Sequence, residues 1–220
     1  MSVGTFVLAF GLVFFSAAVA PAEKPVFSAL GGSCVSSDPG RLCMALKYVV
    51  YRDPAGVPVS GLKAALGNVS VMNRLWSQCG ISFQLEVFTE VDPGRFGLSF
   101  HPSNLSEMDS IRAAFADPSH LLLVTTGNWN RGGTLGDSPA NAWTAMPTAE
   151  PYGSVFEASV ATYSVIYSHE MGHYFNLDHA SHAGDLMNPI IYRRSTHIGA
   201  EECETARATV ESFWSHAIRS

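Results

Sequence analysis

The chain of 220 residues has few charged side chains and no run of lysines or arginines. Charged residues make up 15% of the sequence, with 13 Lys and Arg against 19 Asp and Glu, for a formal net charge of −6. Nucleic acids and anionic membrane surfaces attract basic faces, so this balance argues against both as partners. Internal repeats, low-complexity tracts and interdomain linkers are also missing, while hydrophobic residues account for 47%. This mix excludes a disordered, collagenous or coiled-coil chain and predicts a folded globular protein.

The beginning of the chain carries no charged side chain over residues 1–22, and no later apolar run is long enough to span a bilayer. Ala20 and Ala22 supply the small residues that signal peptidase requires, so we predict a signal peptide over 1–22, cleaved after Ala22. An uncleaved membrane anchor is the alternative, because a positive charge is missing apart from the α-amino group. Cleavage implies a secreted, extracellular protein (periplasmic in a bacterium) without stable membrane association.

The four cysteines lack the CxxC spacing that is typical of zinc sites. An even number in an exported chain predicts two disulfides, with three possible connectivities. Residues 36–40 predict a turn between Cys34 and Cys43, so a bridge between these two is geometrically easy and leaves Cys79 to pair with Cys203. The alternative is that Cys34 is a free thiolate that binds a metal.

The spacing of apolar residues predicts strands that alternate with helices in the first half of the chain, which indicates a βαβ-type sheet. The stretch 127–153 is rich in Gly, Asn, Pro and Ser and is expected to be irregular, apart from an edge strand over 140–146. The other expected strands cover 44–52, 81–91 and 120–126, and the expected helices cover 60–77, 104–115, 159–176 and 200–217.

Residues 169–173 read HEMGH, an HExxH motif inside the helix expected over 159–176. Four residues are about one helical turn, so His169 and His173 project from one face and can bind a single zinc ion. Glu170 lies beside them, where it can take a proton from a water on the metal. A solvated helix face with two histidines is the alternative, but this helix is apolar nearly all round. Buried His and Glu side chains need polar partners, and a metal supplies them.

The motif continues beyond the helix. Residues 169–179 read HEMGHYFNLDH, so a third histidine, His179, follows the second by six positions. Residues 184–189 read GDLMNP and place Met187 eight positions after His179. Together these pieces resemble the metzincin family of zinc metalloproteases, whose pattern is HExxHxxGxxH followed by a methionine turn. Asn176 stands where the family has a glycine in the left-handed conformation, and Asn is the non-glycine residue best able to adopt it.

The resemblance implies a metzincin-like α+β or α/β fold: a twisted, mostly parallel sheet with an active-site helix and a C-terminal helix. It implies one zinc ion per chain, held by His169, His173 and His179, with water in an open fourth position. Glu170 would be the general base that activates the zinc-bound water for hydrolysis of a peptide bond. Met187 would form an apolar floor beneath the ligands. The expected protein is a secreted zinc endopeptidase that acts as a monomer on protein or peptide substrates.

Several further residues are candidates for the same site. Asp178 and His182 are the alternatives to His179 as third ligand. Tyr192, just beyond the methionine turn, and Trp143, in the expected edge strand, are candidates for a substrate pocket. A packed aromatic side chain is the alternative for Tyr192. The edge strand itself resembles the strand on which many metzincins align their substrate.

The expected division of the chain is a signal peptide over 1–22, a short N-terminal segment over 23–43 and a catalytic domain over 44–220. The segment 23–43 is too short for a large folded pro-domain but can act as a pro-peptide. Two alternative functions remain. One is a gluzincin-type site, with Glu201 or Glu202 as the distal third ligand; the other is an inactive or latent secreted zinc-binding module.

Overall fold

The computed structural model describes residues 26–30, 32–136 and 138–220 of the chain. The predicted signal peptide over 1–22 lies outside the described residues. Within the described ranges, no helix combines the length and the apolar character that a bilayer crossing needs.

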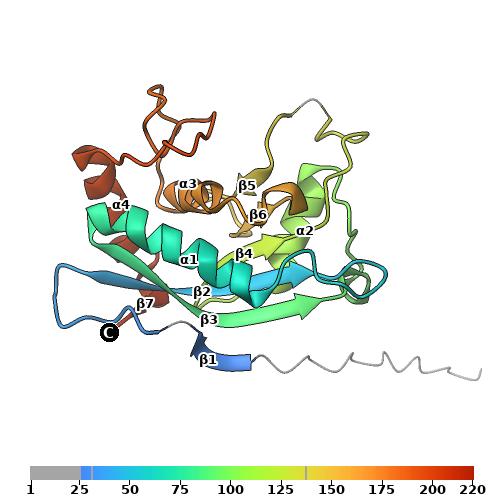
Figure 1. Ribbon diagram of the computed structural model, residues 1–220, viewed down its shortest axis with the longest axis horizontal. Coiled ribbons are helices and arrows are strands. Elements are labelled where there is room, and N and C mark those ends of the chain that lie inside the picture. Colours follow the sequence, from blue (N-terminus) through green and yellow to red (C-terminus); the bar gives the residue numbers. More distant parts are fainter. Residues whose placement is uncertain (1–25, 31, 137) are drawn as a thin grey trace, which may run out of the picture.

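A single mixed sheet forms the centre of the described structure (Figure 1). Its strands run in the order β1-β3-β2-β4-β6-β5, and β7 pairs with β2. The four central strands β3, β2, β4 and β6 are parallel to one another, whereas β1, β5 and β7 pair antiparallel with their neighbours. The bounds are β1 (Val26–Leu30), β2 (Leu42–Tyr51), β3 (Ile81–Val91), β4 (Leu121–Thr125), β5 (Ala142–Thr144), β6 (Ser154–Phe156) and β7 (Ile218–Arg219). The predicted α+β fold with a mostly parallel sheet is therefore confirmed.

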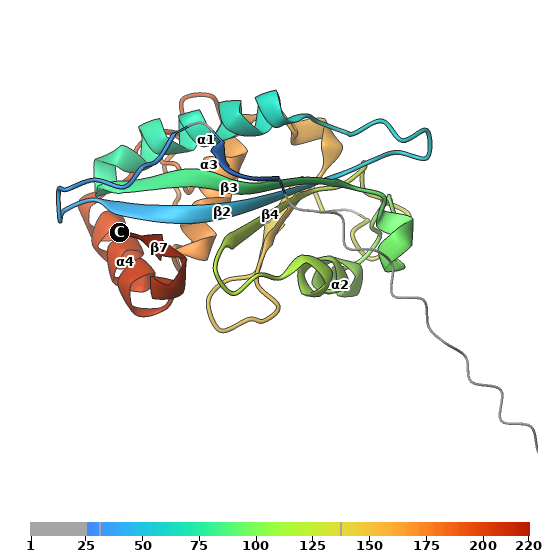
Figure 2. The ribbon, with the colours of Figure 1, turned by 90° about the horizontal axis from the view of Figure 1, so that it is seen from below.

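Helices cover both faces of this sheet. Figure 2 shows α1 (Leu62–Trp76) and α3 (Ser164–Tyr174) on one face and α2 (Leu105–Phe115) on the other. The C-terminal helix α4 (Ala200–Ser212) contacts the 3-10 turn that precedes β3. Two buried tryptophan side chains bond to the backbone of α3. The indole Nε1 of Trp76 donates to the carbonyl oxygen of Ser168 at 3.0 Å, and the indole Nε1 of Trp214 donates to the carbonyl oxygen of Tyr174 at 2.6 Å.

The elements of the first half match the sequence-based expectations closely. The strand expected over 120–126 is β4, all five residues of which are buried. Asn104, the first residue of the helix expected over 104–115, accepts a hydrogen bond from the backbone N–H of Glu107 and caps the start of α2. Three short strands, β1, β6 and β7, were not predicted, because none of them forms a continuous apolar run like that of β4 or a clear alternation of apolar and polar residues.

The two later helices are shorter than predicted. The helix expected over 159–176 is limited to Ser164–Tyr174, because residues 158–160 form a separate 3-10 turn whose Val160 packs in the core. The helix expected over 200–217 ends at Ser212, and a 3-10 turn follows over Ser215–Ala217. The indole of Trp214, which bonds to α3, is buried between these two pieces.

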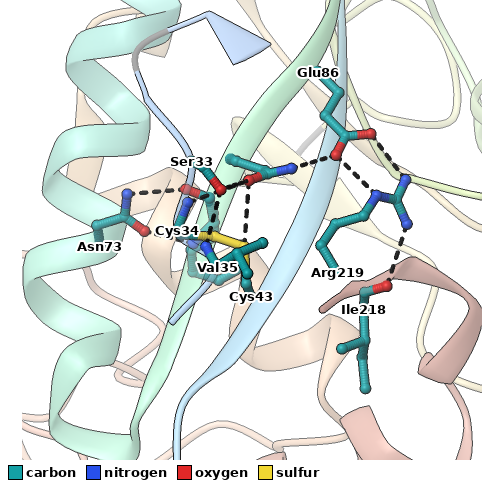
Figure 3. The surroundings of a disulfide bond; sticks show 10 residues. Ser33, Cys34, Val35, Cys43, Asn73, Glu86, Ile218 and Arg219 are labelled. Carbon is teal, nitrogen blue, oxygen red and sulfur yellow. Dashed lines mark hydrogen bonds and ion pairs between the residues drawn. A yellow bond between two sulfur atoms is a disulfide. The ribbon is translucent and has the colours of Figure 1, made fainter. Parts of the chain in front are cut away.

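Both disulfides join the cysteines that the sequence paired. Cys34 bonds to Cys43 across a Cα–Cα distance of 5.4 Å, and Cys79 bonds to Cys203 across 4.9 Å. The alternative of a free Cys34 thiolate is wrong. Figure 3 shows the first bridge beside β3, where the side-chain oxygen of Gln84 accepts from Ser33 Oγ at 3.1 Å and from the Cys34 backbone N–H at 3.2 Å. The described part of the segment 23–43 thus contributes strand β1 and both cysteines of the first disulfide to the folded unit.

Candidate metal centre

Helix α3 carries the first two candidate ligands inside the protein. Eight of its eleven residues are buried, among them His169 and Glu170. The helix ends where Asn176 adopts a left-handed conformation with φ 63°, which turns the chain back toward the helix. This is the conformation expected from the sequence at that position. The turn brings His179 next to the two helical histidines.

The three predicted histidine ligands lie together. Their candidate ligand nitrogens all lie within 4.8 Å of one another, and the Nε2 atoms of His173 and His179 are 3.2 Å apart. Two nitrogens on one tetrahedral zinc, each about 2.0–2.1 Å from it, lie about 3.3 Å from each other. The spacing therefore fits a shared metal ion. Among the described residues this is the one group of three or more His, Cys, Asp or Glu side chains that could hold a metal.

Backbone carbonyls orient two of the imidazole rings. His169 Nδ1 lies 2.7 Å from the Leu186 oxygen, and His173 Nδ1 lies 2.8 Å from the Leu177 oxygen. A carbonyl can only accept, so Nδ1 carries the proton in both rings and Nε2 is left free to bind a metal. Burial lowers the pKa of His169 to about 3 and also lowers the pKa of His173. Both rings are therefore neutral at pH 7, which is the ligating form.

Met187 packs directly beneath this helix. Its side chain is fully buried, and a Cβ added at Gly172 would lie 2.1 Å from the Met187 Sδ atom. A glycine is thus required at this position of the HExxH motif for the methionine to approach. The segment that carries Met187 is held by a backbone hydrogen bond from the Ala180 N–H to the Met187 oxygen at 2.8 Å. The sequence placed Met187 here but gave no role to Gly172, although a glycine inside a helix is the available signal.

Glu170 is buried next to the histidine group. Its carboxylate accepts a hydrogen bond from the hydroxyl of Thr144 on the edge strand β5. Burial raises the pKa of Glu170 to about 7, although the Thr144 hydrogen bond and the charge of Arg112 act in the opposite direction. A buried carboxylate whose charge is stabilised by a single hydrogen bond is a good proton acceptor beside a metal.

Arg112 of α2 is a second residue that sequence reasoning missed. Its guanidinium is buried and donates to the carbonyl oxygens of Gly153 at 2.9 Å and Trp143 at 3.0 Å. These bonds tie the helix on the far face of the sheet to the edge strand. Neither Arg112 nor Thr144 carries a local sequence signal, because each reaches the site from an element distant in the sequence.

Comparison with known proteins finds similarity to solved structures but not to a family model or a curated sequence. The metalloproteinase-II from Bacteroides fragilis is similar with a TM-score of 0.49 and 13% sequence identity, over 82% of this chain and 59% of that chain. The chain thus spans less than two thirds of that protein's length. A likeness at this level says nothing about activity, so the case for a metal centre rests on the histidine geometry.

The other candidates from the sequence lie outside the histidine group. Asp178 and His182 are exposed, and neither belongs to it. Glu201 and Glu202 lie in the first turn of α4, where Glu202 accepts from the Gly199 backbone N–H at 2.6 Å. Neither glutamate therefore belongs to the group that contains the two helical histidines.

The two candidate pocket residues are both exposed aromatic side chains. Trp143 is 37% exposed on β5, and Tyr192 is 41% exposed in the segment after the methionine turn. The guanidinium of Arg194 lies 5.4 Å from the centre of the Tyr192 ring. Tyr192 is thus not the packed aromatic residue that was the alternative.

Proposed function

We propose that this chain is a secreted zinc endopeptidase of the metzincin type. The observation that carries the proposal is the convergence of three imidazoles beside a buried carboxylate. Helix α3 supplies two of the rings and the carboxylate, and the left-handed turn at Asn176 supplies the third. The methionine turn beneath them matches the second element of the metzincin pattern.

In this proposal His169, His173 and His179 would hold one zinc ion, and Glu170 lies beside them on the same helix. Zinc bound there would polarise the scissile carbonyl and make an adjacent water more acidic. Glu170 takes a proton from the attacking water and passes it to the amine that leaves. Its raised pKa suits both steps, because the group must accept a proton and then release it near neutral pH.

The edge strand β5 supports internal cleavage of an extended chain. Asn141 accepts from Glu157 N–H at 2.8 Å, and Ala145 N–H donates to Gly153 at 3.2 Å, so these odd-numbered positions face β6. In an antiparallel pair the alternate residues point their backbone groups away from the partner. Ala142 and Thr144 therefore offer backbone N–H and C=O groups to an incoming strand, and none of the described strands pairs there. Trp143 and Tyr192 are proposed to line the substrate pocket.

Secretion is supported by the two disulfides and by the apolar leader. We propose that residues 1–22 are removed, that 23–43 form a short N-terminal segment and that 44–220 form the catalytic domain.

The proposed function is tested with the purified chain from residue 23, by measuring zinc content together with hydrolysis of quenched peptides and casein. The expected result is one zinc per chain and cleavage within the peptides that a chelator stops and added zinc restores. Zinc without cleavage would indicate an inactive or latent zinc-binding module. A chain that binds no zinc would overturn the proposal.

A further inference from the structure

We infer that Thr144 is a positioning residue for Glu170, and that it fixes the carboxylate relative to the strand that receives the substrate. The inference rests on the proposed function, because Glu170 matters in this way only as the general base. It assigns a task in the reaction to a side chain of β5, in addition to the backbone groups of that strand.

A chain of two hydroxyl groups leads to the Glu170 carboxylate. Thr144 Oγ1 donates to Glu170 Oε2, and Thr144 Oγ1 lies 2.6 Å from Ser154 Oγ on the neighbouring strand β6. Since the Thr144 proton is engaged by the carboxylate, Ser154 must be the donor in the second bond. Ser154 is fully buried. The orientation of the Thr144 hydroxyl is therefore set from both sides.

The strand that carries Thr144 is itself held in place. Buried Arg112 bonds to the carbonyl oxygen of Trp143, the residue before Thr144, at 3.0 Å. The same guanidinium bonds to Gly153, the residue before Ser154, at 2.9 Å. Thr144 is also β-branched, which restricts rotation about its first side-chain bond. A hydroxyl on this strand is thus a rigid support.

The Glu170 carboxylate has no other such support. Over residues 26–30, 32–136 and 138–220, the bond from Thr144 is the only hydrogen bond that the Glu170 side chain makes. One oxygen, Oε2, is thus occupied, and Oε1 is left to exchange a proton. The same short strand presents its backbone to the substrate and its hydroxyl to the base. Loss of the hydroxyl is therefore expected to misplace the base without disturbing the zinc ligands.

Three single variants of the zinc-loaded chain test this inference. Thr144→Val keeps the shape of the side chain and removes the hydroxyl, and Thr144→Ser keeps the hydroxyl. Thr89→Val is the matched control, because Thr89 is a partly buried threonine of β3, which β2, β4 and β6 separate from β5. We expect Thr144→Val to lower kcat by about 10–100-fold, with zinc content unchanged and KM within about twofold. Thr144→Ser should recover kcat to within about threefold of the parent, and Thr89→Val should equal the parent.

Parent-like kcat in Thr144→Val would overturn the inference. A Thr144→Ser variant with a kcat as low as that of Thr144→Val would also overturn it. So would a Thr144→Val variant that changes only KM or only zinc content.

A second measurement uses the zinc-free chain and needs no activity. Thr144→Val is introduced into the parent and into a Glu170→Ala background, and the thermal unfolding midpoint is compared. We expect the valine to lower the midpoint in the parent more than in the Glu170→Ala background, because only the parent contains the Thr144–Glu170 bond. Equal effects in both backgrounds would overturn the inference while leaving the proposed function intact. A parent chain that binds no zinc would overturn the proposed function, and this cycle would still report on the Thr144–Glu170 contact.

Discussion

Two glutamates thirteen positions apart have almost the same exposed fraction but differ in their hydrogen-bond partners and in their pKa. Glu157 is 6% exposed and Glu170 is 5% exposed. The carboxylate of Glu157 accepts from the Trp129 backbone N–H at 2.7 Å and from Arg131 at 2.8 Å. Side chains of Asn141 and Ser159 add further bonds. The carboxylate of Glu170 accepts from Thr144.

The difference appears in the two pKa values. Burial by itself would raise the pKa of both groups. At Glu157 the hydrogen bonds from Asn141 and Trp129, together with the charge of Arg131, outweigh burial and hold the pKa below its usual range. At Glu170 burial prevails and raises the pKa to about 7.

This contrast separates an anchor from a reactive group. Glu157 fastens the segment around Trp129 and Arg131 to the start of the edge strand, so its charge is used to hold structure. Glu170 has one donor and a raised pKa, a combination that costs stability and is typical of a functional site. The two side chains are similarly shielded from solvent, but Glu170 is desolvated more strongly and has fewer hydrogen-bond donors, and the two differences together separate their tasks.

The largest expected effect comes from His179, the most exposed of the three proposed zinc ligands. His179→Ala should weaken zinc binding by more than about 100-fold and abolish chelator-sensitive cleavage, because two imidazoles alone hold zinc poorly. Both carboxylates stay intact in this variant, so the loss would show that Glu170 acts only with the metal. Zinc content and peptide hydrolysis are the measurements. His182→Ala is the matched control, since His182 is an exposed histidine three residues farther along and should keep one zinc per chain.

The next prediction concerns the packing of Met187 against Gly172 of α3. Gly172→Ala places a methyl group against the Met187 sulfur and should lower the free energy of unfolding by about 2–3 kcal/mol. The change is measured by denaturant unfolding. Gly67→Ala in α1 is the control, because nothing lies within 4 Å of a Cβ at that position. Alanine there should stabilise the chain by up to about 1 kcal/mol. Equal effects at the two glycines would contradict the contact between Gly172 and Met187.

The anchoring role of Glu157 predicts a loss of stability on neutralisation. Glu157→Gln removes the charge that Arg131 and Asn141 contact and should cost about 1–3 kcal/mol of unfolding free energy at pH 7. Because the folded pKa of Glu157 is lowered, its contribution is fully present above the unfolded pKa of about 4.3 and is lost as the pH falls through the folded value. The stability gap between parent and variant should therefore shrink in acid. Glu170→Gln in the zinc-free chain should not reduce stability, and a larger loss there than at Glu157 would reverse the comparison.

The smallest expected effect concerns the turn that brings His179 to the site. Asn176→Ala forces an ordinary side chain into the left-handed conformation and should cost about 1 kcal/mol, whereas Asn176→Gly should change stability by less than about 0.5 kcal/mol. Thermal unfolding of the zinc-free variants measures both. An alanine variant as stable as the glycine variant would show that the left-handed turn is not needed.

Local patterns predicted the grouping of the three histidines far better than they predicted its surroundings. The helical spacing of His169 and His173 and the left-handed turn at Asn176 are set within one short stretch, so the sequence predicts both. Thr144 and Arg112 reach Glu170 through strand pairing and helix packing between distant segments. Such contacts depend on the register of β5 against β6, which three-residue strands do not reveal in the sequence.

The same limit applies to the fold. The long strands β2 and β3 follow from periodicity and turn residues, whereas β1, β6 and β7 are short and depend on pairing with neighbouring strands.

The central claim is that Glu170, and not Glu157, exchanges the proton in the reaction. The most direct measurement compares zinc content and kcat for peptide cleavage in the parent, Glu170→Gln and Glu157→Gln chains. We expect one zinc per chain in all three, a fall in kcat of about 10²–10⁴-fold in Glu170→Gln, and a change of less than about tenfold in Glu157→Gln. A Glu170→Gln chain that retains zinc and cleaves peptides at the parent rate would contradict the account.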